Sequence, residues 1–197
     1  MNPNGLEQFW GYVEAGGLVM PPLVAATLVL WYVLGLRLVT LQRGAVEGLP
    51  VLVQHGLEGT LTPRGVVARA VSDAVEVFRS SSDQLRTRLD EALYPHQQAI
   101  KVGQTVVRVI VLTAPLAGLL GTVSGMIETF DSLADMAMFT QTGGIAAGIS
   151  QALITTQMGL IVAAPGVVVG RILEKRQHLI EDELERIKDM FCAMEAP

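Results

Sequence analysis

The sequence predicts an all-α integral membrane protein with three transmembrane helices and cytosolic helical extensions. Half of the 197 residues are apolar and only 17% are charged, whereas a soluble domain usually has about a quarter charged residues. Three long stretches lack charge almost entirely, and about twenty such residues suffice to cross a bilayer. The basic residues are also confined to two blocks of the chain. Together these observations favour a multi-pass membrane protein.

The positions of Lys and Arg predict the orientation of the spans. All 14 fall either between Arg37 and Arg108 or between Arg171 and Lys188, so residues 1–36 and 109–170 contain none. Cytosolic flanks of membrane helices keep Lys and Arg, while exported flanks lack them. We therefore expect a periplasmic N-terminus and a cytoplasmic C-terminus.

The first expected elements are a periplasmic segment over residues 1–17 and a first transmembrane helix over residues 18–36. Phe9, Trp10 and Tyr12 precede this span, where aromatic side chains suit the headgroup level. The stretch lacks the basic start of a signal peptide, so we expect a retained anchor.

Residues 37–108 are expected to form a cytosolic helical region. Thr62 and Pro63 read as a helix start, and apolar residues recur at helical spacing through residues 65–93. We expect one amphipathic helix there, packed on the cytosolic ends of the spans.

The remaining elements are a second transmembrane helix (109–130), a periplasmic turn (131–143), a third transmembrane helix (144–170) and a cytosolic C-terminal helix (171–197). The last has an apolar stripe suited to bundling, formed by Ile172, Leu179, Ile180, Leu184, Ile187 and Phe191.

Small residues recur four apart in the second and third spans. Such spacing lets helix backbones approach closely in lipid, so each subunit is expected to pack tightly against copies or partners. The glycines assigned to helix packing are Gly118, Gly121, Gly125, Gly144, Gly148 and Gly159.

The same two spans carry hydroxyl and amide groups that lipid would not solvate. Thr122 and Thr156 lie near mid-depth, and Gln151 and Thr155 share a helix face while Thr156 points elsewhere. Each threonine either bonds a carbonyl of its own helix or lines a polar path. The sequence leaves both roles open.

Two segments resemble the paired signatures of the MotA/TolQ/ExbB proton-channel family. They are Ala-Pro-Leu-Ala-Gly-Leu-Leu-Gly-Thr-Val-Ser-Gly-Met-Ile-Glu-Thr-Phe (114–130) and Gly-Ile-Ser-Gln-Ala-Leu-Ile-Thr-Thr-Gln-Met-Gly-Leu-Ile-Val-Ala-Ala-Pro (148–165). Residues 16–23, followed by Arg37, also resemble the first span of the family. Length and topology look like the ExbB/TolQ branch.

The resemblance implies a bacterial inner-membrane subunit that assembles as a pentamer. The pentamer would surround an ExbD/TolR-like dimer, whose single spans carry a proton-binding Asp, and proton flow would drive mechanical work on the envelope, with a TonB/TolA-like protein as a further partner. Thr122 and Thr156 match the channel threonines of the family, and Thr155 and Gln151 join them in the expected proton pathway.

One position departs from the family pattern. Many ExbB and TolQ proteins have a glutamate where this chain has Gln151, and an amide cannot bind and release a proton. Glu128, the acid of the second span, is either solvated at the interface or placed at the proton entrance.

A passive oligomeric membrane scaffold without ion conduction is the alternative hypothesis. The sequence suggests no enzyme, no cofactor and no metal site, because no catalytic pairing or metal-ligand spacing appears. The net charge of −5 does not favour a nucleic-acid surface, so the expected surroundings are membrane lipid and protein partners.

Overall fold

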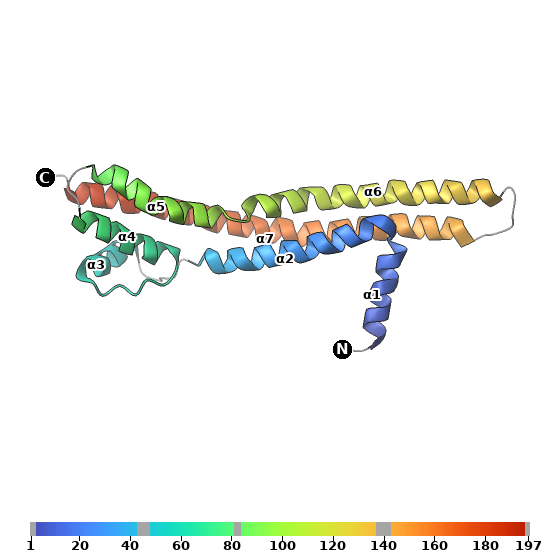
Figure 1. Ribbon diagram of the computed structural model, residues 1–197, viewed down its shortest axis with the longest axis horizontal. Coiled ribbons are helices and arrows are strands. Elements are labelled where there is room, and N and C mark those ends of the chain that lie inside the picture. The colour runs from blue at the N-terminus through green and yellow to red at the C-terminus, as the bar shows by residue number, and fades with distance from the viewer. Residues whose placement is uncertain (1–2, 43–47, 81–83, 137–142, 196–197) are drawn as a thin grey trace. The chain divides into compact units, whose positions relative to one another are not determined.

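The computed structural model describes residues 3–42, 48–80, 84–136 and 143–195, and its regular elements are all helices (Figure 1). In these ranges three helical stretches are long and apolar enough to cross a membrane. They include α2 (Met20–Thr40) and most of α6 (Gln104–Met136) and α7 (Gly143–Glu195). The prediction of an all-α membrane protein is confirmed at this level.

The chain folds into two compact units. The first unit comprises Met1–Val33 and Thr105–Val169, and the second comprises Leu34–Gln104 and Gly170–Pro197. The helices α2, α6 and α7 contribute residues to both units.

The first unit contains α1 (Pro3–Ala15), the short 3-10 helix η1 (Gly17–Val19) and the apolar parts of α2, α6 and α7. Its interior includes Met20, Leu23 and Leu30 of α2 and Val162 of α7. Large apolar side chains also cover its outside, which suits lipid or other helices better than water. Leu28, Trp31, Leu112, Leu116, Leu119, Leu120, Ile127, Leu153 and Leu160 are each more than half exposed.

The second unit packs α3 (Leu49–Glu58), α4 (Val66–Ser80) and α5 (Leu85–Lys101) with the C-terminal part of α7. Helix α3 stops at Gly59, whose φ of 76° is the left-handed conformation that ends many helices. Helix α4 buries Val67, Val71 and Ala74 completely, as expected from their helical spacing. Its Phe78 lies 5.4 Å from Phe191 of α7, measured between ring centroids.

The expectation of one amphipathic helix over residues 65–93 is wrong. Helix α4 ends at Ser80 and α5 begins at Leu85, after Gln84 with a φ of 54°. A non-glycine residue in the left-handed region cannot continue a right-handed helix. Residues 79–84 (Arg-Ser-Ser-Ser-Asp-Gln) contain no apolar side chain, and serine and aspartate are typical of turns and helix starts. The sequence therefore carries a sign of the break, which the apolar spacing on either side obscured.

Two further helix ends differ from the expected elements. Helix α6 continues beyond residue 130 to Met136, so part of the expected turn is helical, and residues 137–142 lie outside the described residues. Helix α7 is continuous from Gly143 to Glu195. The third span and the C-terminal helix are therefore one element.

The apolar stripe of the C-terminal helix is partly used within the second unit. Ile180, Leu184, Ile187 and Phe191 are buried there, whereas Ile172 and Leu179 are exposed. Burial of the first group already stabilises the subunit itself, so only the exposed part remains for bundling with another chain.

Helix α5 runs antiparallel to the C-terminal part of α7, because Arg86 lies near Asp189 while Lys101 lies near Glu181. Lys188 Nζ lies 2.6 Å from an Asp90 carboxylate oxygen and 2.9 Å from one of Glu185. Its side chain is only 6% exposed. Burial alone would lower the pKa of Lys188, but the hydrogen bonds and negative charges of Asp90 and Glu185 raise it overall.

Candidate functional site

Helices α6 and α7 approach each other through glycines in the first unit, where they run side by side (Figure 1). A Cβ added to Gly125 would lie 2.6 Å from the Gly148 carbonyl oxygen, and one added to Gly159 would lie 2.7 Å from the Ala114 carbonyl oxygen. A Cβ at Gly118 would be 3.1 Å from the Thr155 carbonyl oxygen. Backbone therefore faces backbone along this contact, as small residues allow.

The sequence analysis assigned these glycines to packing against copies or partners. The structure places Gly118, Gly121, Gly125, Gly148 and Gly159 between two helices of one subunit. Gly144 belongs to α7, but its surroundings lie outside what the structure describes. A role of these residues between copies stays a prediction.

Thr155 fills the space that Gly121 leaves open. Its side chain is completely buried, and any Cβ at Gly121 would overlap it. Its hydroxyl donates to the carbonyl oxygens of Gln151 and Ala152, at 3.0 and 3.1 Å. Within the subunit Thr155 is thus a packing residue bonded to its own helix, and its place in a proton pathway stays a prediction.

Thr156 lies at the edge of the same contact. Its hydroxyl donates to the Ala152 carbonyl at 3.0 Å and lies 3.5 Å from the Gly118 carbonyl oxygen of α6. Thr122 is half-buried and donates to the Leu119 carbonyl at 2.7 Å. Both hydroxyl hydrogens are therefore satisfied by backbone, while both oxygens keep lone pairs that can accept from water or from a partner.

Gln151 and Glu128 meet across the two helices. The Gln151 amide nitrogen donates to a Glu128 carboxylate oxygen at 3.2 Å. The two residues are 23 positions apart, and the sequence indicates no contact between them. Their separation in the chain hides the contact, which only the antiparallel packing of α6 on α7 creates.

The second unit has a buried polar cluster that the sequence analysis missed. Arg37 is 3% exposed and donates from Nη2 to the Gln177 side-chain oxygen at 2.6 Å. The Gln177 amide donates in turn to Glu181 at 3.0 Å and to Gln104 at 3.3 Å. In the sequence Arg37 marks the orientation of the first span and part of its resemblance to the family, and neither indicates that its side chain folds inward.

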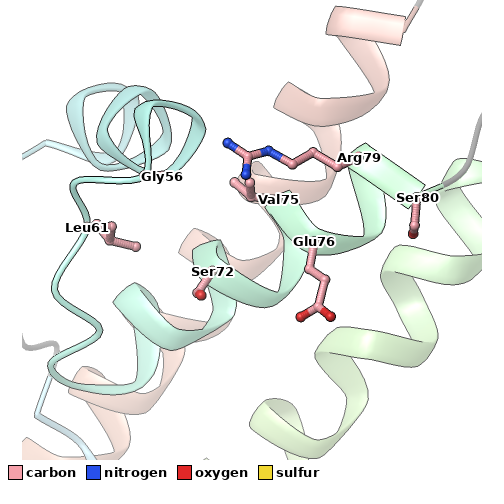
Figure 2. Close-up of a pocket in the computed structure, with 8 residues that line it drawn as sticks. Gly56, Leu61, Ser72, Val75, Glu76, Arg79 and Ser80 are labelled. Atoms are coloured by element: carbon pink, nitrogen blue, oxygen red, sulfur yellow. The ribbon is translucent and has the colours of Figure 1, made fainter.

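The same unit has a surface cavity of about 490 Å³ between the end of α3 and α4. Arg79 reaches towards α3 and donates to the Leu57 carbonyl at 2.6 Å, while Glu76 points away from it (Figure 2). The arginine ties the end of α3 to α4 and partly fills the cavity. The hydrogen bond from Arg79 to Leu57 gives this side chain a structural role in the cavity wall. It does not indicate a ligand.

Helices α6 and α7 thus bring small and polar residues together within apolar segments. This arrangement indicates a membrane protein whose polar groups act at a helix pair. The sequence model of the MotA/TolQ/ExbB proton channel family matches residues 59–186. This match covers more than half of the chain, so the protein belongs to that family. The resemblance described from the signature segments is confirmed.

Individual relatives fall in the ExbB and TolQ branch. The chain is 32% identical over 149 residues to the biopolymer transport protein ExbB of Aquifex aeolicus, covering 70% of this chain and 92% of that protein. It is 31% identical over 130 residues to an ExbB-like protein of Synechocystis, covering 64% of this chain and 62% of the relative. It is 34% identical over 82 residues to the Tol-Pal system protein TolQ of Pseudomonas aeruginosa, covering 42% and 35% of the two chains.

Proposed function

We propose that the protein is a subunit of a proton-driven motor channel of the ExbB/TolQ type in the bacterial inner membrane. It assembles as a pentamer around an ExbD/TolR-like dimer whose single spans carry the proton-binding Asp. Proton flow through this complex produces mechanical work on the cell envelope, passed on through a TonB/TolA-like protein. Family membership supports the proposal, as do three helices able to cross a membrane.

Within the subunit, the proposed pathway runs along Thr122, Thr156, Thr155 and Gln151, with Glu128 at its outer entrance. Thr156 carries most of this assignment, because its hydroxyl lies between a carbonyl of α7 and one of α6. A hydroxyl so placed keeps a free lone pair beside the helix contact. It can orient water or a partner carboxylate there.

The test is the substitution Thr156→Val in the complex reconstituted with an ExbD/TolR-like partner. Valine has nearly the shape of threonine without its hydroxyl. We expect proton flux into liposomes to fall by about fivefold to 150-fold, since a lost buried hydrogen bond costs about 1–3 kcal/mol. Thr122→Val should reduce it less, because its hydroxyl bonds only within α6.

Thr113→Val is the matched control. The Thr113 hydroxyl also bonds its own helix, at 2.8 Å from the Val109 carbonyl oxygen, and its side chain is exposed. It should leave flux unchanged. Normal flux in Thr156→Val, at normal abundance and assembly, would remove Thr156 from the pathway. No flux in the unaltered complex would favour the alternative of a passive oligomeric scaffold.

A further inference from the structure

The carboxylate of Glu128 is held by a partner from another helix. The Gln151 side-chain amide donates to Glu128 and also lies against Gly17. A Cβ added to Gly17 would overlap the amide nitrogen. Gly17 has a φ of 60° and begins η1. The amide is thus confined between the start of η1 and the carboxylate of α6.

The chemistry of this partner differs from that of an ordinary ion pair. Residues 1–36 and 109–170 contain no Lys or Arg, and a cation beside Glu128 would favour its charged form alone. An amide has N–H donors for a carboxylate and a carbonyl oxygen that accepts from a carboxylic acid. Gln151 can therefore bond Glu128 in either protonation state.

The surroundings of Glu128 add a reason for the proton to bind. Glu128 is exposed on α6 and lies within a helical stretch that is long and apolar enough to cross a membrane. A bare charge among apolar side chains in a membrane is costly. Asp131, one turn further along α6, is exposed as well, and no Gln151-like contact holds it among the hydrogen bonds of the described residues.

We propose that Glu128 and Gln151 form a reversible proton-binding pair, in which Glu128 carries the proton and Gln151 positions it in both states. The inference rests on the proposed function and deepens it, because it gives the subunit its own proton carrier besides that of the partner. One proton adds to a Glu128 carboxylate oxygen from water and later leaves it for the next acceptor. No other bond changes.

A carbodiimide tests the pair without a partner or proton flux. Dicyclohexylcarbodiimide modifies protonated carboxyl groups in apolar surroundings, and mass spectrometry of the peptides locates the adduct. In native membranes carrying the full chain, we expect the label on Glu128 and not on Asp131.

Two variants test the pair. Glu128→Gln should abolish the label, and the double variant Glu128→Gln/Gln151→Glu should move it to position 151. An unlabelled Glu128, equal labelling of Asp131, or an unlabelled position 151 in the double variant would overturn the proposal.

Proton flux distinguishes this inference from the proposed function. In the reconstituted complex, Glu128→Gln should lose flux, and the double variant should recover it. Labelling as expected with no flux in the unaltered complex would remove the motor-channel function and leave the pair standing. Flux with an unlabelled Glu128 would support the motor-channel function and remove the Glu128–Gln151 pair.

Discussion

At the scale of single residues, two buried cations organise the second unit. Arg37 donates to the Gln177 amide oxygen and lies near the negative charge of Glu174, but its Nε has no hydrogen-bond partner. Lys188 is bracketed by two carboxylates. A buried charge is tolerated when hydrogen bonds replace its lost hydration. Both residues lie in the basic blocks, where the sequence indicates only solvated charge.

Lys188→Met should destabilise the second unit by about 1–2 kcal/mol, because methionine keeps much of the buried stem but loses both charge-assisted hydrogen bonds. Asp90 and Glu185 are each about half exposed, so water solvates them in the variant and limits the loss. Thermal unfolding in detergent measures it. Arg86→Ala is the control, because its pair with Asp189 spans 3.7 Å and both side chains are 66% exposed. An equal loss of stability in Arg86→Ala would show that the burial of Lys188 does not strengthen its ion pairs.

The pH dependence of the Lys188 contribution follows from the direction of its pKa shift. The pKa is raised in the folded state, so the contribution is complete below the ordinary lysine pKa of about 10.4 and is lost as pH rises through the raised value. The difference in unfolding temperature between the unaltered protein and Lys188→Met should therefore be constant from about pH 6 to about pH 9. A difference that shrinks across this range would contradict the assignment.

At the scale of elements, α6 and α7 can approach closely because glycines, which have no side chain, lie at their contact. A Cβ at Gly148 would lie 2.6 Å from the Gly125 carbonyl oxygen and would overlap the Thr129 hydroxyl. Thr129 is itself buried and donates to the Gly125 carbonyl at 2.8 Å. The helices cannot separate locally without also disturbing the contacts of Thr155 and of the Glu128–Gln151 pair.

Gly148→Leu should therefore disrupt the subunit before it affects any assembly. We expect a loss of about 3 kcal/mol or more, since overpacking a rigid backbone contact costs at least as much as overpacking a core. Membrane abundance and protease resistance measure the subunit, and native mass spectrometry measures the oligomer. Gly35→Leu is the control, because a Cβ at Gly35 meets nothing within 4 Å. Gly148→Leu with normal abundance and an intact oligomer would contradict the packing role.

At the scale of the whole molecule, the orientation in the membrane rests on charge alone. The basic residues avoid residues 1–36 and 109–170, and this asymmetry predicts which ends of the spans stay in the cytosol. The second unit carries both basic blocks, apart from Arg108, which lies in the first unit. We therefore propose that the second unit lies in the cytoplasm.

Reporter fusions test this orientation. Fusions after Arg43 and after Arg176 should report cytoplasm, and a fusion at Thr140 should report periplasm, because Lys and Arg oppose export of their flanks. Arg43 and Thr140 lie outside the described residues, so the experiment addresses the sequence prediction directly. A cytoplasmic location for Thr140 would contradict the three-span topology.

The sequence by itself determined the helical membrane class, the family and the apolar face of α4. These follow from composition, signature residues and local periodicity, which act through the nearest neighbours in the chain. Only the tertiary structure decided that the helix break falls at Gln84, that Arg37 is buried, and that Gln151 meets Glu128. Each depends on backbone conformation or on residues far apart in sequence, brought together by the approach of one helix to another. No periodic pattern records such contacts, because periodicity gives the face of a helix and not the side chain opposite it.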